Sequence, residues 1–188
     1  MRFSKLNIAL VALTLALVPA LSACGHKEDV VTTAKTEGPY IDLGPLQYQV
    51  QISRQLNPAL VEDGPYLQGI SPADAKLKPT ETWFGVFVRV TNDTGKYQPA
   101  ANDFSIDDTQ HHVFKPIALP ASNGFAYEGG VLPPKSQLPP IDSAASVTSI
   151  NGQLLLFKLN LDSLANRPLE LHFTGAGQSD EARIDLDV

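Results

Sequence analysis

Apolar side chains recur at every second position in several runs of this chain, and this alternation constrains the fold more than any other feature. Over 46–53, leucine, tyrosine, valine and isoleucine alternate with glutamines and a serine, which is typical of a strand with one buried and one solvated face. Runs over 154–161, 169–173 and 184–188 also alternate. With 15 prolines and 13 glycines to supply turns and no long helical pattern, the sequence predicts an antiparallel all-β fold.

The segment Thr82–Asn92 is predicted to be the central strand. Its even-numbered positions from 84 to 90 are phenylalanine and valines, and Trp83 and Phe87 give the other face large apolar groups as well. A strand that is apolar on both faces is expected to be covered on both sides. Gly85 leaves room for a close neighbour, such as a bulky side chain of the adjacent strand.

The N-terminal region has the layout of a secretory signal peptide, with basic Arg2 and Lys5, an apolar run over 8–18 and small residues after it. The run is shorter than the roughly 20 residues that a membrane span needs. Leu21–Cys24, with the sequence Leu-Ser-Ala-Cys, resembles the lipobox of bacterial lipoproteins. This resemblance implies that Cys24 is lipidated, becomes the mature N-terminus and anchors the protein in the cell membrane, facing the extracytoplasmic side.

An ordinary secretory signal whose cleavage site lies beside a cysteine is the alternative. Cys24 is the only cysteine, so no disulfide partner exists within the chain. A free thiol would be a liability in an oxidising compartment, which favours the lipoprotein interpretation.

Charge argues against nucleic-acid partners. The formal net charge is −6, and loss of residues 1–23 removes two basic residues and no acid, leaving −8. Because no basic stripe is available to hold phosphates, nucleic-acid binding is not expected. Electrostatic attraction to anionic lipids is disfavoured for the same reason.

The chain is therefore expected to comprise a signal peptide over 1–23, a flexible tether over 24–37 and one β-sandwich domain over 38–188. The tether is assigned because it is polar and lacks apolar periodicity. A flexible segment of this length spans on the order of 20 Å, which would lift the domain off the bilayer.

Two long connections are expected to carry the binding surface. Asn57–Thr80 and Ala118–Ile141 are rich in proline, and connections of such length are uncommon in compact domains and are often functional. Prolines restrict the backbone in advance, so that less freedom is lost on binding. Tyr127, Leu132 and Leu138 are expected to supply apolar contacts there. The solvated glutamine face of the first alternating strand is the less favoured surface.

A predicted hairpin over 104–114 carries the cluster that comes nearest to metal-binding chemistry. Asp107, Asp108, His111 and His112 are weak candidate ligands, because both histidines could meet one ion only if the local chain is irregular. Their spacing matches neither a zinc site nor an EF-hand, and the chain has no Gly-x-Ser-x-Gly motif. An exposed polar hairpin is favoured, with no metal, cofactor or catalytic residue.

Several segments resemble an uncharacterised immunoglobulin-like domain that is common in bacterial lipoproteins. The strongest are 83–92 (WFGVFVRVTN) and 102–108 (NDFSIDD), while 151–158 and 168–171 fit the closing strands of that domain. The resemblance extends from Leu46 to the end, and implies an exported antiparallel immunoglobulin-like β-sandwich without catalytic residues. The long insertion and the proline-rich loop depart from the family pattern.

The sequence as a whole predicts a lipid-anchored extracytoplasmic binding or accessory domain, and not an enzyme. Its expected partners are the membrane, through the N-terminal lipid, and an envelope protein or a cell-wall component. The alternative is a metal-handling protein or an enzyme that uses the Asp107–His112 hairpin.

Overall fold

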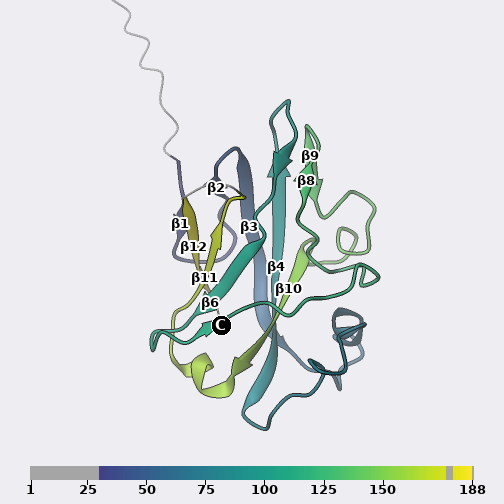
Figure 1. The fold of residues 1–188 in the computed structure, drawn as a ribbon, viewed down its shortest axis with the longest axis vertical. Coiled ribbons are helices and arrows are strands. Elements are labelled where there is room, and N and C mark those ends of the chain that lie inside the picture. The colour runs from purple at the N-terminus through teal and green to yellow at the C-terminus, as the bar shows by residue number, and fades with distance from the viewer. Residues whose placement is uncertain (1–29, 177–179, 188) are drawn as a thin grey trace, which may run out of the picture.

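The computed structural model describes residues 30–176 and 180–187, which form two β-sheets packed against each other (Figure 1). The elements are β1 (Thr33–Ala34), β2 (Ile41–Leu43), β3 (Leu46–Leu56), η1 (Gly64–Leu67), β4 (Glu81–Asn92), β5 (Gln98–Pro99), β6 (Asp103–Asp107), β7 (Val113–Phe114), β8 (Val131–Leu132), β9 (Ser136–Leu138), β10 (Gln153–Asn160), η2 (Leu161–Ala165), β11 (Leu169–Thr174) and β12 (Glu181–Leu186). The η elements are 3₁₀ turns, and within the described ranges no helix is long and apolar enough to cross a membrane.

The first sheet has the order β1-β12-β11-β6-β7, and the second has the order β10-β4-β3-β2, with β9 also paired to β4. Strands β5 and β8 form a separate pair. Only the short β1–β12 pairing is parallel among the named strands. The predicted antiparallel all-β sandwich is confirmed.

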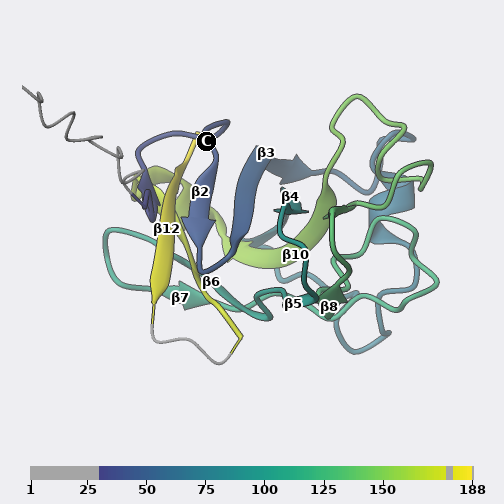
Figure 2. The same cartoon turned by 90° about the horizontal axis from the view of Figure 1, so that it is seen from above.

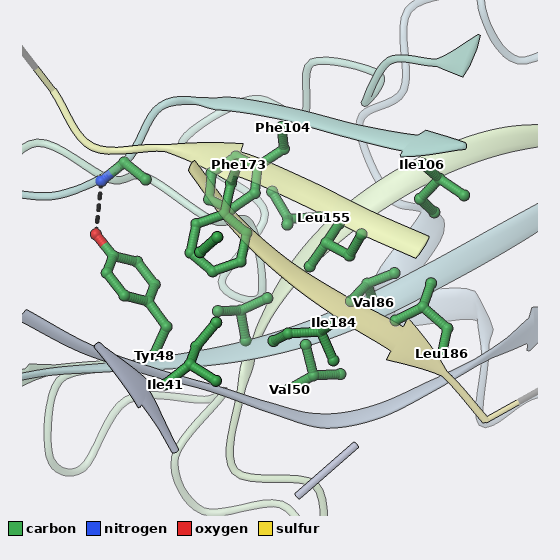
Figure 3. Packing of buried hydrophobic residues seen from close by; sticks show 14 of the residues in the cluster. Ile41, Tyr48, Val50, Val86, Phe104, Ile106, Leu155, Phe173, Ile184 and Leu186 are labelled. Atoms are coloured by element: carbon green, nitrogen blue, oxygen red, sulfur yellow. Dashed lines mark hydrogen bonds between the residues drawn. The ribbon is translucent and has the colours of Figure 1, made fainter. Parts of the chain in front are cut away.

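The main core lies between the two sheets and takes inward-facing side chains from both (Figure 3). Tyr48 marks one end of it: its hydroxyl oxygen accepts the N–H of Ala101 at 2.7 Å, and its ring lies 4.9 Å from that of Phe173. Burial raises the pKa of Tyr48 to about 12, although the hydrogen bond from Ala101 acts in the opposite direction. The hydroxyl therefore stays neutral and joins β3 to the segment before β6.

A second apolar layer covers the other face of β4 and β10, and the long connections build it (Figure 2). Its buried members are Leu56, Tyr66, Trp83, Phe87, Leu154 and Leu156. Asn123 ties the two connections together, because its side-chain amide donates to the carbonyls of Tyr66 at 3.1 Å and Gln68 at 3.0 Å. As predicted, β4 is covered on both sides.

Gly85 has the close neighbour that the sequence predicts. A Cβ atom added there would lie 2.9 Å from Leu154 Cδ1 and 3.1 Å from Leu56 Cδ1. Any side chain at this position would require the methyl groups of these leucines to shift.

The alternation along β3 breaks at a β-bulge between Val50 and Ile52. An extra residue in one strand reverses the faces of the side chains that follow it. Ile52 is consequently 37% exposed, whereas Ser53 is 4% exposed. The prediction that Ile52 lies on the buried face is wrong, while the buried placement of Leu46, Tyr48 and Val50 is confirmed.

The expected tether over 24–37 is also wrong in its second half. Residues 24–29 lie outside the described residues, as does the signal peptide. Thr33 and Ala34, however, pair with β12, and the Val31 carbonyl accepts the N–H of Asp42 at 2.6 Å. A strand of two residues is too short to show alternation, and its partner lies at the far end of the chain, so no local pattern revealed it.

Glu37 fixes the same segment further. Its carboxylate accepts the N–H of Ser53 at 2.9 Å and the N–H of Asp187 at 3.1 Å, while Asp187 accepts the Thr36 hydroxyl at 2.6 Å. Burial raises the pKa of Glu37 despite these hydrogen bonds. The first described residues are thus fastened to both sheets.

Candidate functional site

The predicted hairpin is confirmed as β6 and β7, but its tip is not the simple solvated acidic turn that the sequence predicts. The Asp108 carboxylate is fully buried. Its Oδ1 accepts the N–H groups of Gln110 at 2.8 Å and His112 at 3.0 Å, and its Oδ2 accepts the Asn166 side-chain amide at 3.1 Å. Asp108 therefore holds the turn together and attaches it to the segment after η2.

His112 is occupied by the same carboxylate, with Nδ1 at 2.9 Å from Asp108 Oδ2. Burial alone would raise the pKa of Asp108, but hydrogen bonds from His112 and Asn166 outweigh it and hold that pKa well below its usual range. His111 is exposed and has a φ of 62°, so the chain here is irregular. In the part of the chain that the structure describes, no group of three or more His, Cys, Asp or Glu residues is placed to hold a metal ion.

Asp108→Asn is expected to destabilise the domain by about 1–3 kcal/mol at pH 7. The NH₂ group of the new amide would face the NH₂ group of Asn166, so a buried hydrogen bond would be lost. The pKa of Asp108 is lowered by folding, so its contribution is complete above the unfolded value of about 4 and is lost as pH falls below it. Urea unfolding at several pH values should therefore show the difference between variant and wild type shrinking in acid.

Asp103→Asn is the matched control, because Asp103 lies at the other end of β6 in an exposed pair with Lys115. It should change the free energy of unfolding by less than about 0.5 kcal/mol. Equal effects of the two variants at pH 7 would contradict the structural role of Asp108.

Beside the hairpin lies a polar cleft of about 450 Å³ on the outer face of the first sheet. It is lined by Asp107, Asp108, Thr109, His111, Pro168, Glu170, His172 and Arg183. The strand order brings these groups together, since Glu170 faces Asp107 of β6 and His172 faces Arg183 of β12. Sequence reasoning found the hairpin residues but missed Glu170, His172 and Arg183, for which the only signal was their alternation with apolar residues.

Charges in and around the cleft are largely paired with one another. Asp107, Glu170 and Asp185 are neighbours across three strands, an arrangement of like charges that is unfavourable by itself. Lys35 offsets it, with Nζ at 3.4 Å from Asp185 and 3.9 Å from Glu170. The segment before β2 therefore contributes to this face.

His172 lies between two carboxylates. Its Nδ1 is 2.9 Å from Glu181, and its Nε2 is 3.3 Å from Glu170 at a geometry that does not complete a hydrogen bond. Asp107 Oδ1 is likewise buried without a hydrogen-bond partner among the described residues. Both atoms are closed to solvent, and the residues that line the cleft are not arranged as a nucleophile with an adjacent base.

The apolar residues expected on the Ala118–Ile141 connection belong to the core instead. Leu132 is buried in β8, and Leu138 and Tyr127 are half-buried against the main core. The Tyr127 hydroxyl donates to the Ala101 carbonyl at 2.9 Å. The prediction that turns hold these side chains out toward solvent is wrong, because the connection folds back as β8 and β9 and fills the edge of the sandwich.

The Asn57–Thr80 connection does present apolar side chains to solvent. Leu60 is 44% exposed and Val61 is 94% exposed. Their loop is closed by Asp63, which is buried, pairs with the Arg54 guanidinium and accepts the N–H of Asn57 at 2.7 Å. Burial would raise the pKa of Asp63, but these partners hold it below its usual range.

Backbone hydrogen bonds complete this loop. The Leu60 carbonyl accepts the N–H groups of Asp63 and Gly64, both at 3.2 Å, and the Leu60 N–H donates to the Asn57 carbonyl at 2.9 Å. Leu60 and Val61 are therefore exposed on a loop whose own conformation is fixed.

The chain matches no protein-family model and no curated protein. Among solved structures it is similar to the yjhA protein of Bacillus subtilis, with 10% identity over 81% of this chain and 99% of that chain and a TM-score of 0.46. A candidate lipoprotein of Bacillus subtilis, ycdA, has 13% identity over 78% of this chain and 38% of that chain, with a TM-score of 0.48. An uncharacterized β-sandwich protein of Clostridium difficile has 10% identity over 82% of this chain and 95% of that chain, with a TM-score of 0.46.

Proposed function

We propose that this protein is a lipid-anchored extracytoplasmic domain that binds an envelope protein or a cell-wall component. The observation that carries the binding role is the exposure of Leu60 and Val61 on a loop fixed by Asp63. A loop that is already ordered loses little conformational freedom when a partner covers it, and its apolar tips gain from leaving water. Membrane attachment rests on the lipobox resemblance of Leu21–Cys24.

The alternative of a metal-handling protein or an enzyme has less support. Its hairpin residues Asp108 and His112 satisfy each other and hold the turn, which leaves fewer free ligands than the sequence offers. The other two candidate ligands, Asp107 and His111, line the polar cleft, so a metal ion would have to bind there.

Replacing Leu60 and Val61 together by Ser is expected to remove the partner of the wild-type protein without unfolding the domain. Both side chains point to solvent, so their loss should change stability by less than about 1 kcal/mol. Partners would be captured by crosslinking in intact cells and compared by mass spectrometry, after circular dichroism has confirmed that each purified variant is folded.

Val147→Ser is the control for exposed apolar area, since Val147 is 72% exposed on a different loop. It should keep the partner. A third variant, with His111 and His112 both changed to Ala, tests the alternative through bound metal. If the Leu60/Val61 variant keeps every partner while the histidine variant loses metal and partner together, the proposed binding role is wrong.

A further inference from the structure

We infer that one end of the sandwich rests against the lipid headgroups of the bilayer, in a fixed orientation that points the Leu60–Val61 loop away from the membrane. The inference rests on the proposed lipidation of Cys24. We call this surface the anchor end. Its exposed residues include Val30, Val31, Lys96, Tyr97, Lys135 and Ile141, together with the carboxylate of Asp93.

The connection between lipid and fold is short. Only the six residues 25–30 separate Cys24 from Val31, and six residues span at most about 20 Å when fully extended. Val31 is already fixed, because its carbonyl accepts the N–H of Asp42 at 2.6 Å and the neighbouring Thr32 carbonyl accepts the N–H of Arg183 at 3.0 Å. The end of the domain that carries Val31 therefore cannot leave the vicinity of the headgroups.

Three turns lie at the same end as the start of the described chain, at the top of Figure 1. They are the β2–β3 turn at Gly44–Pro45, the β4–β5 turn over 93–97 and the β8–β9 turn over 133–135. The last two are joined, since Asn92 pairs with Ser136 and the Lys135 N–H donates to the Thr94 carbonyl at 3.2 Å. Strand β3 runs from this end to the opposite one, where it leads into the Leu60–Val61 loop.

The side chains of the anchor end suit the boundary between water and lipid. Tyr97 and Val30 are each 68% exposed, and Ile141 is 76% exposed at the rim of a cleft of about 350 Å³ that Lys135 also lines. Tyrosine places an apolar ring beside a polar hydroxyl at such boundaries, and lysine can extend its ammonium group to the headgroup phosphates. Lys96 lies next to Tyr97 and is exposed as well.

The outer face of the first sheet has the opposite character. Asp107, Glu170 and Asp185 form a row of carboxylates across it, and Asp103 and Glu181 add two more. Such a face favours water over the headgroup region, because the headgroup phosphates repel carboxylates and attract lysine ammonium groups. The domain therefore stands on its anchor end and does not lie on this sheet.

The test uses single nitroxide labels on the acylated protein in phosphatidylcholine vesicles. Acylation consumes the only native cysteine, so one new cysteine gives one label. Gly95→Cys places it in the β4–β5 turn, where an added Cβ meets nothing within 4 Å. Val61→Cys places the control label at the opposite end. The label at 95 is expected to be several-fold less accessible to a water-soluble nickel chelate, and more accessible to lipid-soluble oxygen, than the label at 61.

Mass spectrometry of the same samples separates the two possible failures. If Cys24 carries no acyl group, the proposed lipid anchoring itself is wrong. If Cys24 is acylated and the labels at 95 and 61 are equally accessible to the nickel chelate, or the label at 61 is the protected one, the inferred orientation is overturned.

Discussion

Val88→Asp is expected to abolish cooperative folding of the domain. Val88 is 1% exposed in the middle of β4, where it pairs with Val50 of β3 and Gln153 of β10. Its side chain faces the main core, whose members among the described residues are all apolar, so that a carboxylate would find no cation there. Burying an unpaired charge costs several kcal/mol, whereas a domain of this kind is stable by only about 5–15 kcal/mol.

Thermal and urea unfolding of the soluble domain would measure this effect, with Gln55→Asp as the matched control. Gln55 lies on the exposed side of β3, so the same carboxylate would remain in water there and should change the free energy of unfolding by less than about 0.5 kcal/mol. A Val88→Asp domain that melts within a few degrees of wild type would show that β4 is not the centre of the fold.

Cys24→Ser is expected to leave the protein without a lipid and, in molecules from which residues 1–23 have been removed, to release it from washed membranes. Serine lacks the thiol that acylation requires, and the remaining domain carries a formal charge of −8 and no basic stripe to bind the bilayer. Metabolic labelling with a fatty-acid analogue should mark the wild type alone. Equal labelling of the two proteins would contradict the assignment of Cys24.

The sequence predicts the strands well, because period-two alternation follows directly from the geometry of an extended chain. Thr82–Asn92 is recognisable as the central strand from its two apolar faces alone, and the hairpin around Asp107–Asp108 is recognisable from its acidic turn. The bulge at Val50–Ile52 cannot be recognised from the sequence. An inserted residue changes which face the following side chains occupy, but the alternation of apolar and polar residues continues unchanged.

What escapes prediction depends on contacts between distant parts of the chain. The tether over 24–37 reads as polar, yet Thr33 and Ala34 complete a sheet through a partner near the C-terminus. Tyr127, Leu132 and Leu138 are predicted to be exposed, yet Leu132 is buried and the other two are half-buried, because their connection folds over the edge of the sandwich. A local sequence pattern shows that a residue is apolar, but it does not show which distant segment packs over that residue.

The candidate site divides in the same way. The sequence identifies Asp107, Asp108, His111 and His112 as candidate ligands. In the structure, Asp108 and His112 hydrogen-bond to each other and stabilise a turn. The polar cleft depends on β11 lying between β6 and β12, which brings Glu170 and His172 beside Asp107. Strand order is not encoded in any local alternation, so these neighbours could not be assigned from the sequence.

The measurement that tests the central claim most directly is the mass of the N-terminal peptide of the mature protein, isolated from its own membranes. Lipid anchoring predicts a peptide that begins at Cys24 and carries the added mass of fatty acyl chains, with residues 1–23 absent. A peptide that begins elsewhere, or one in which Cys24 keeps a free thiol, would contradict it.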